Sequence, residues 1–267
     1  MKYRKILLTI AVACLSPSFS SATILEDFHF NDSDGTSLGA AVNSANPGNQ
    51  LIPDTDHVAT IQVQAGALNI VKNDTATVNE GLAFADVSSG TLWLVGTFKN
   101  WSFPGPAIPS DVEDIRFGFM GTEDITPPPS STVLAEMLIR RNTASGGMEF
   151  LGTALGAGGT NTTPVPVNTI QNSPFTMAMK VDQDTNTYEV FYKDGLNPYV
   201  SGGTGTLEPT RDALVVRFTV NNFIGDVSGE FANLDRFYVT TDFAVPEPGS
   251  AYSLMLSLVG LAGFRRF

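Results

Sequence analysis

Apolar and polar side chains alternate with a period of two along most of the chain, which is typical of β-strands. The alternation is clearest between Phe175 and Gly195, where two alternating runs flank the polar segment 182–186 and predict a β-hairpin. Outside the two termini no long stretch favours a helix. The chain is therefore predicted to be all-β, an antiparallel two-sheet sandwich of about ten to fourteen strands. Further strands are expected at residues 25–30, 58–64, 67–71, 91–99, 115–119, 148–151, 214–220 and 237–239.

Two segments say more about the sheets. Residues 91–99 are apolar on both faces, with Leu92 and Leu94 on one and Trp93 on the other, which predicts a central strand. Residues 133–141 are ambiguous, because an apolar stripe at helical spacing overlaps a run of strand-forming residues. The neighbouring strands and the Gly-Gly pair that follows favour a strand there.

The amino terminus has the three parts of a secretory signal peptide. Three basic residues are followed by an apolar core and by small residues that predict cleavage after Ala22. Residues 1–22 are therefore expected to be removed during export through the Sec translocon. Cys14, the only cysteine, lies in this segment and loosely matches the acylated cysteine of lipoproteins, so acylation is the alternative to ordinary cleavage.

Removal of this segment leaves a body without cysteine, in which neither disulfides nor thiol chemistry are available. Three of the fifteen basic residues leave with the signal peptide, so twelve remain against twenty-seven acidic residues. This balance argues against binding to nucleic acid or to anionic lipid surfaces. Only 16% of the chain is charged and 42% is hydrophobic, so the body is expected to fold. Residues 23–244 suit one large β-sandwich domain.

Residues 245–267 form a tail with three parts. It begins with a motif whose two prolines fix φ and remove two backbone donors, which keeps it extended and accessible: Val245, Pro246, Glu247 and Pro248. An apolar run follows, predicted to be a hydrophobic helix, and Arg265 and Arg266 form a basic stop suited to a cytoplasmic lipid surface. The run of 14 residues is shorter than the roughly 17–25 of a full membrane span. The alternatives are a frayed apolar C-terminus and an amphipathic terminal helix.

The order of motif, apolar segment and basic end resembles the PEP-CTERM sorting signal of Gram-negative envelope proteins. The resemblance covers only the final residues of the chain. It implies that a membrane-embedded exosortase recognises the tail and cuts it at the motif. The protein is then expected to be anchored transiently in the inner membrane and to reach the cell envelope or the extracellular matrix.

A second resemblance concerns the body. The opening LEDFHFNDSDGTSLGAAVNS, the hairpin MKVDQDTNTYEVFYKDG and the closing strand LDRFYVT resemble the concanavalin A/laminin-G-like jelly roll. This implies a curved two-sheet sandwich with a concave face that binds sugars or other partners in some relatives. Those relatives include enzymes as well as binding and structural domains, so the fold alone does not define the function.

No catalytic residue is assigned. The segment 35–39 matches the G-x-S-x-G nucleophile elbow in letters only, because no helix follows it and both histidines lie early in the chain. Laminarinase-like members of the jelly-roll fold use Glu-x-Asp-x-x-Glu on one strand, and the nearest match, around Asp114, lacks the second glutamate. With two histidines and no mature cysteine, a Cys/His zinc site is also excluded. His29 is interpreted as a solvent-facing strand residue.

One pattern concerns a metal cofactor. Asp182, Asp184 and Asn186 have the alternating oxygen ligands that begin a calcium loop. The glycine and the glutamate that complete an EF-hand are missing, so a turn-stabilising role is favoured over Ca²⁺ binding.

Four aromatic residues have faces that suit stacking on sugar rings: Trp93, Trp101, Tyr192 and Tyr199. Core packing explains Trp93 best. Trp101 and Tyr199 are predicted to be exposed, because each lies beside Pro- or Gly-rich turn signals.

The sequence therefore favours a secreted, exosortase-sorted protein with a non-enzymatic structural or adhesive role in an extracellular polysaccharide matrix. The alternative is a carbohydrate-binding module, with or without calcium, on the concave sheet. A polysaccharide hydrolase or lyase is the third hypothesis.

Overall fold

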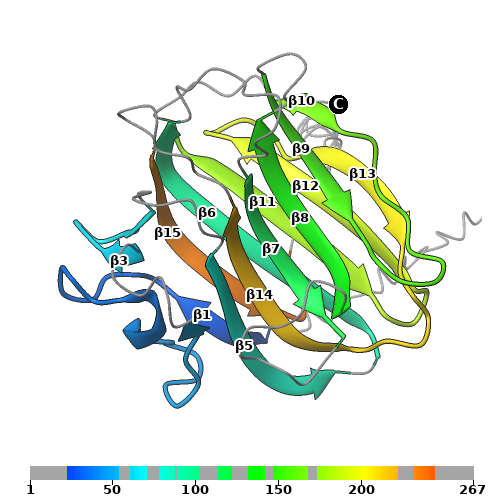
Figure 1. Cartoon of the computed structure of the whole chain (residues 1–267), viewed down its shortest axis with the longest axis horizontal. Coiled ribbons are helices and arrows are strands. Elements are labelled where there is room, and N and C mark those ends of the chain that lie inside the picture. The colour runs from blue at the N-terminus through cyan, green and yellow to red at the C-terminus, as the bar shows by residue number, and fades with distance from the viewer. Residues whose placement is uncertain are drawn as a thin grey trace, which may run out of the picture.

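Two antiparallel sheets, A and B, pack face to face in the computed structural model and together contain fifteen strands (Figure 1). The structure describes residues 23–53, 61–70, 78–87, 89–102, 114–121, 132–141, 147–167, 173–221 and 231–243. The predicted signal peptide and the predicted sorting tail, including Ala22, Val245, Pro246, Glu247, Pro248, Arg265 and Arg266, lie outside these residues. The predicted all-β sandwich is confirmed, although the described residues alone form fifteen strands where about ten to fourteen were expected.

Sheet A has eight strands in the order β13-β12-β11-β6-β15-β4-β3, with β1 paired to β15. The pair β11–β12 is the predicted hairpin, with Phe175 opposite Asp194 and Asp182 opposite Thr187. β6 lies between β11 and β15, so the prediction of a central strand is confirmed. The bounds are β1 (Ile24–Phe28), β3 (Ile61–Val63), β4 (Leu68–Ile70), β6 (Thr91–Ser102), β11 (Phe175–Asp182), β12 (Thr187–Asp194), β13 (Val200–Thr206) and β15 (Phe231–Thr240).

Sheet B has seven strands in the order β10-β9-β8-β7-β14-β5-β2. The ambiguous segment is β8, a strand paired with β7 and β9. A short 3₁₀ helix, η1 (Leu38–Ala40), connects β1 and β2, and no helix among the described residues is long and apolar enough to cross a membrane. The bounds are β2 (Ile52–Pro53), β5 (Val78–Val87), β7 (Asp114–Met120), β8 (Val133–Arg141), β9 (Met148–Thr153), β10 (Val165–Val167) and β14 (Ala213–Asn221).

The core lies between the sheets because alternate side chains of each strand point inward. Its centre is the contact between Phe117 of β7 and Gly96 of β6. A Cβ on Gly96 would lie only 2.9 Å from the Phe117 ring, so glycine is what lets this ring approach the opposite sheet. Phe117 also packs against Phe218 of its own sheet and against Phe237 of sheet A, with ring centroids 5.1 and 5.3 Å away.

Edge strand β13 was missed by the sequence pattern, as were β2, β5 and β10. Three of the seven β13 residues are glycines, which are unfavourable in strands. The structure explains them: a Cβ on Gly205 would lie 2.4 Å from the Tyr188 ring, and a Cβ on Gly202 would lie 2.8 Å from the Phe150 ring. Gly202 and Gly205 therefore make room for aromatic rings of β9 and β12.

The outward face of sheet B carries buried ion pairs. Gly118 of β7 lies between Arg217 of β14 and Glu136 of β8 in the sheet register. Across this glycine Arg217 donates to Glu136 through Nε (3.1 Å) and through Nη2, and the side chains of both residues are 3% exposed. Along the same face Arg116 donates to Asp114 through Nε and Nη2, at 2.7 and 2.6 Å. Charges buried in this way need their partners.

Gly118→Ala is expected to destabilise the protein by about 1–3 kcal/mol, because the added methyl group overlaps its neighbours. Its Cβ would lie 2.3 Å from Glu136 Cγ and 2.8 Å from the Ala135 carbonyl oxygen. Urea denaturation measures the free energy of unfolding. Gly48→Ala is the matched control, since a Cβ there meets nothing within 4 Å, and it should change stability by less than about 0.5 kcal/mol. Equal stability of the two variants would contradict the assigned packing.

Candidate functional site

A hollow of about 380 Å³ opens where the edge strands of the two sheets meet. β10 is the edge of sheet B and β13 the edge of sheet A, and both lie toward the upper right in Figure 1. The volume is in the range of small-ligand sites. The described residues that line the hollow come from β10, the end of β12, the following turn and the start of β13: Pro166, Val167, Tyr192, Asp194, Asn197, Pro198 and Val200.

The polar and aromatic groups of the hollow are held by the fold. Tyr192 packs against Phe150 and Phe175 of the core, with ring centroids 5.4 and 6.1 Å away, so its ring has a fixed position. Asp194 ends β12, and its carboxylate accepts a hydrogen bond from the Ser173 hydroxyl at 3.3 Å. The Asn197 backbone N–H donates to the Asp194 carbonyl at 3.0 Å, which closes the turn. Tyr192, Asp194 and Asn197 thus line a hollow whose other lining residues are prolines and valines.

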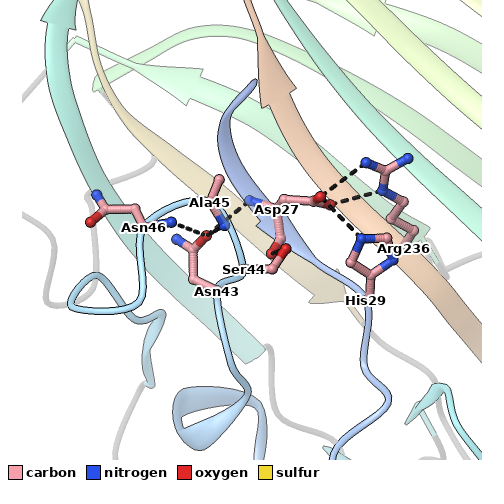
Figure 2. Close-up of polar contacts among 7 residues, drawn as sticks. All are labelled: Asp27, His29, Asn43, Ser44, Ala45, Asn46 and Arg236. Carbon is pink, nitrogen blue, oxygen red and sulfur yellow. Dashed lines mark hydrogen bonds and ion pairs between the residues drawn. The ribbon is translucent and has the colours of Figure 1, made fainter. Parts of the chain in front are cut away.

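A second polar cluster lies on the outward face of sheet A (Figure 2). Arg236 of β15 donates to the two carboxylate oxygens of Asp27 at 2.8 and 2.9 Å, and His29 Nε2 lies 3.0 Å from Asp27 Oδ2. Burial by itself would raise the pKa of Asp27, but the hydrogen bonds and charge of Arg236 outweigh it and hold that pKa below the ordinary 3.8. The bond to Asp27 in turn raises the pKa of Arg236. His29 is exposed, as predicted, but it lies one residue beyond the end of β1 and not in a strand.

Asn43 holds the loop beside this cluster in place. Its side-chain oxygen accepts hydrogen bonds from the backbone N–H groups of Asp27, Ala45 and Asn46 at 3.0–3.2 Å (Figure 2). Its amide nitrogen donates to Glu26, a carboxylate that is itself 2% exposed. Asn43 is fully buried, so these bonds satisfy groups that water cannot reach. The position of Asp27 is therefore fixed from both sides.

The prediction that Trp101 is exposed for glycan stacking is wrong. Trp101 is 2% exposed and packs against Phe175 in the core. The reason is a bulge in β6: Phe98 pairs with Leu234 and Asn100 with Asn233, so two residues of β6 match one step of β15. The extra residue reverses the alternation beyond it and turns Trp101 inward.

Tyr199 lies beside the hollow, but its ring is on the other side of the loop. It contacts Phe243 edge-on, with centroids 5.6 Å apart, and Lys193 Nζ lies 5.6 Å from its ring. Burial raises the pKa of Tyr199 to about 12. Of the four aromatic candidates only Tyr192 lines the hollow. The sequence analysis did not single out Asp194 and Asn197, which also line the hollow, although the Asp-Gly and Asn-Pro turn signals mark their loop.

The candidate calcium residues occupy the β11–β12 turn. Asp182 accepts a hydrogen bond from the Thr185 N–H at 3.0 Å, and this bond lowers the pKa of Asp182. Asp184 accepts one from the Gly90 N–H at 3.1 Å, and Asn186 has a positive φ of 53°. These contacts stabilise the turn, which is the role that the sequence favoured for these residues. Within the described residues, no cluster of three or more His, Cys, Asp or Glu side chains could hold a metal ion.

No protein-family model and no curated protein matches the chain. Among solved structures it is similar to the CBM2 module of the evolved Dit of Lactobacillus casei BL23 phage J-1 (11% identity, 84% of this chain and 99% of that chain, TM-score 0.53). It is also similar to an endo-1,3-β-glucanase from Streptomyces sioyaensis (13%, 83% and 96%, TM-score 0.54). A third is the botulinum neurotoxin type G receptor-binding domain (8%, 87% and 51%, TM-score 0.50). These likenesses show the fold, a concanavalin A-like jelly roll.

Asp27→Asn should lower the stability at neutral pH by about 2 kcal/mol, because it removes the charge that Arg236 pairs with. The folded pKa of Asp27 is lower than the unfolded value, so the ionised group stabilises the fold at pH values above about 3.8. This contribution is lost as the pH falls through the folded pKa. Chemical denaturation of both proteins at several pH values should show a difference that is largest near neutrality and shrinks in acid. A difference that stays constant down to pH 2 would contradict the pairing.

Proposed function

We propose that this protein is an exported, non-enzymatic polysaccharide-binding protein and that the hollow between β10, β12 and β13 holds a sugar residue. The observation that carries this proposal is the convergence of Tyr192, Asp194 and Asn197 on one hollow of about 380 Å³. An aromatic face suits the apolar face of a pyranose, while a carboxylate and a carboxamide suit its hydroxyl groups. The structural or adhesive role expected from the sequence would follow from such binding.

The fold is consistent with this proposal. One similar structure is named as a CBM2 module and another as an endo-1,3-β-glucanase, so the jelly roll accommodates both carbohydrate binding and hydrolysis. Since both neighbours share little sequence with this chain, the choice between binding and hydrolysis depends on this chain's own residues.

The carboxylates favour binding over hydrolysis. A glycosidase needs two carboxyl groups facing a sugar, one of them able to donate a proton. On the outward face of sheet B, Asp114, Glu136 and Glu149 are each paired with a guanidinium group and are at most 6% exposed. A carboxylate that is buried and held by a guanidinium group in this way is not presented to a sugar as hydrolysis requires. These carboxylates therefore support a structural role.

Export and sorting belong to the same proposal. The signal peptide would direct the chain out of the cytoplasm, and the PEP-CTERM-like tail would bring it to an exosortase in the inner membrane. An acidic, cysteine-free body suits a protein that works among polysaccharides outside the cell.

Loss of the Asn197 carboxamide is expected to weaken glycan binding about tenfold, the effect of one lost hydrogen bond. Tyr192→Phe keeps the ring in place and should have a smaller effect, whereas Tyr192→Ala should abolish binding. Binding of the purified protein is measured first on a glycan array and then by titration calorimetry with the best ligand. Leu196→Ala is the matched control, because Leu196 belongs to the same loop and is 100% exposed. Unchanged binding by both Tyr192→Ala and Asn197→Ala would exclude the hollow as the site.

Replacement of Pro246 and Pro248 by Ala should leave unprocessed protein in the inner membrane, because the extended, accessible motif is lost. Cell fractionation and immunoblotting compare the size and location of the variant with those of the wild-type protein. Normal processing of the double variant would contradict recognition through the two prolines.

A further inference from the structure

A cluster of aromatic rings covers part of the outward face of sheet A. We call it the Phe243 cluster, and its members are Trp93, Phe191, Tyr199, Tyr238 and Phe243. The Phe243 ring centroid lies 5.2 Å from that of Trp93, 5.6 Å from Tyr199 and 6.3 Å from Tyr238. Trp93 also contacts Phe191 at 5.7 Å. Trp93 is only 7% exposed, although it points away from the core.

The sheet register explains why there is room for aromatic rings here. Tyr238, Val95, Ala178 and Phe191 are neighbours in one row across β15, β6, β11 and β12. The two middle residues are small and are buried at 1% and 0%, while Tyr238 and Phe191 stand on either side and remain half-buried. Phe243 comes from beyond the end of β15, and its ring packs against this face at an angle, tilted by 55° to Trp93 and edge-on to Tyr199 and Tyr238.

Polar groups flank the cluster in the adjoining row. Arg236, Thr97, Thr176 and Lys193 follow one another across the same four strands. The Arg236 guanidinium lies 4.3 Å from the Tyr238 ring centroid, and Lys193 Nζ lies 5.6 Å from that of Tyr199. Aromatic faces bordered by hydrogen-bond donors are the chemistry that recognises a sugar ring.

We propose that the Phe243 cluster is a second sugar-stacking site and that the Phe243 ring occupies the place of a sugar until residues 241–243, which follow β15, are displaced. This inference rests on the proposed polysaccharide-binding function and extends it. Tyr199 connects the two sites, since its neighbours Pro198 and Val200 line the hollow while its own ring contacts Phe243. A polysaccharide chain that crosses this loop would meet both sites.

The two tryptophans make the inference testable in the full-length protein. Trp101 is 2% exposed, so a change in emission after Phe243→Ala reports on Trp93. The emission is expected to shift to longer wavelength, and laminarihexaose or cellohexaose should then quench it saturably and reverse the shift. Phe243→Leu, which keeps apolar bulk but removes the ring, should give a smaller shift and a weaker response. The wild-type emission should not respond to either sugar.

Two comparisons separate this inference from the proposed function. Phe243→Ala combined with Asn197→Ala should keep the Trp93 response while binding in the hollow weakens about tenfold, and Leu196→Ala should behave as wild type. A Trp93 response without any binding by the wild-type hollow would leave the second site standing and overturn the proposed function. The Phe243→Ala protein could fold, as judged by a cooperative thermal transition, and yet show no change in emission with either sugar. Phe243 would then serve only to pack against the cluster. That result would overturn the inference.

Discussion

The contact of the Phe117 ring with Gly96 sets the relation between the two sheets. Stacked sheets lie about 10 Å apart, and the space between them must be filled without overlap. Phe117 fills it at the centre because Gly96 has no Cβ to oppose the ring. Both residues belong to interior strands, β7 and β6, so their contact fixes the positions of many others. Trp93 lies on the same strand as Gly96, and Asp114 on the same strand as Phe117.

The outward faces of the sheets then acquire different characters. On sheet B the register brings Arg217, Gly118 and Glu136 into one row, and the glycine lets the two charges meet. Such a buried pair adds little net stability over an apolar pair, but removing either partner is costly. On sheet A small residues separate Tyr238 from Phe191, and aromatic rings cover that face. The outward face of sheet B is therefore held together by ion pairs. The outward face of sheet A carries the aromatic rings proposed to bind a sugar.

The sequence predicts what depends on local periodicity. The β11–β12 hairpin and the central position of β6 follow from alternation and from apolar residues on both faces, and both are confirmed. β13 could not be found in this way, because its glycines are explained only by the space that the rings of Tyr188 and Phe150 on other strands require. Trp101 was misplaced because the β6 bulge depends on pairing with β15, which no local pattern shows. The hollow likewise combines β10 with β12 and β13, strands from opposite sheets.

The two proposed binding surfaces meet at the loop 195–199. Phe243, the last residue that the structure describes, contacts this loop through Tyr199. The loop 195–199 lies between the hollow and the Phe243 cluster, and Phe243 is three residues before Pro246. Three residues span at most about 10 Å of backbone, so the proposed sorting motif begins close along the chain to the residue whose ring fills the cluster. An enzyme at the motif and a polysaccharide at the cluster would then compete for the same space. Binding at the cluster would therefore have to follow release from the membrane.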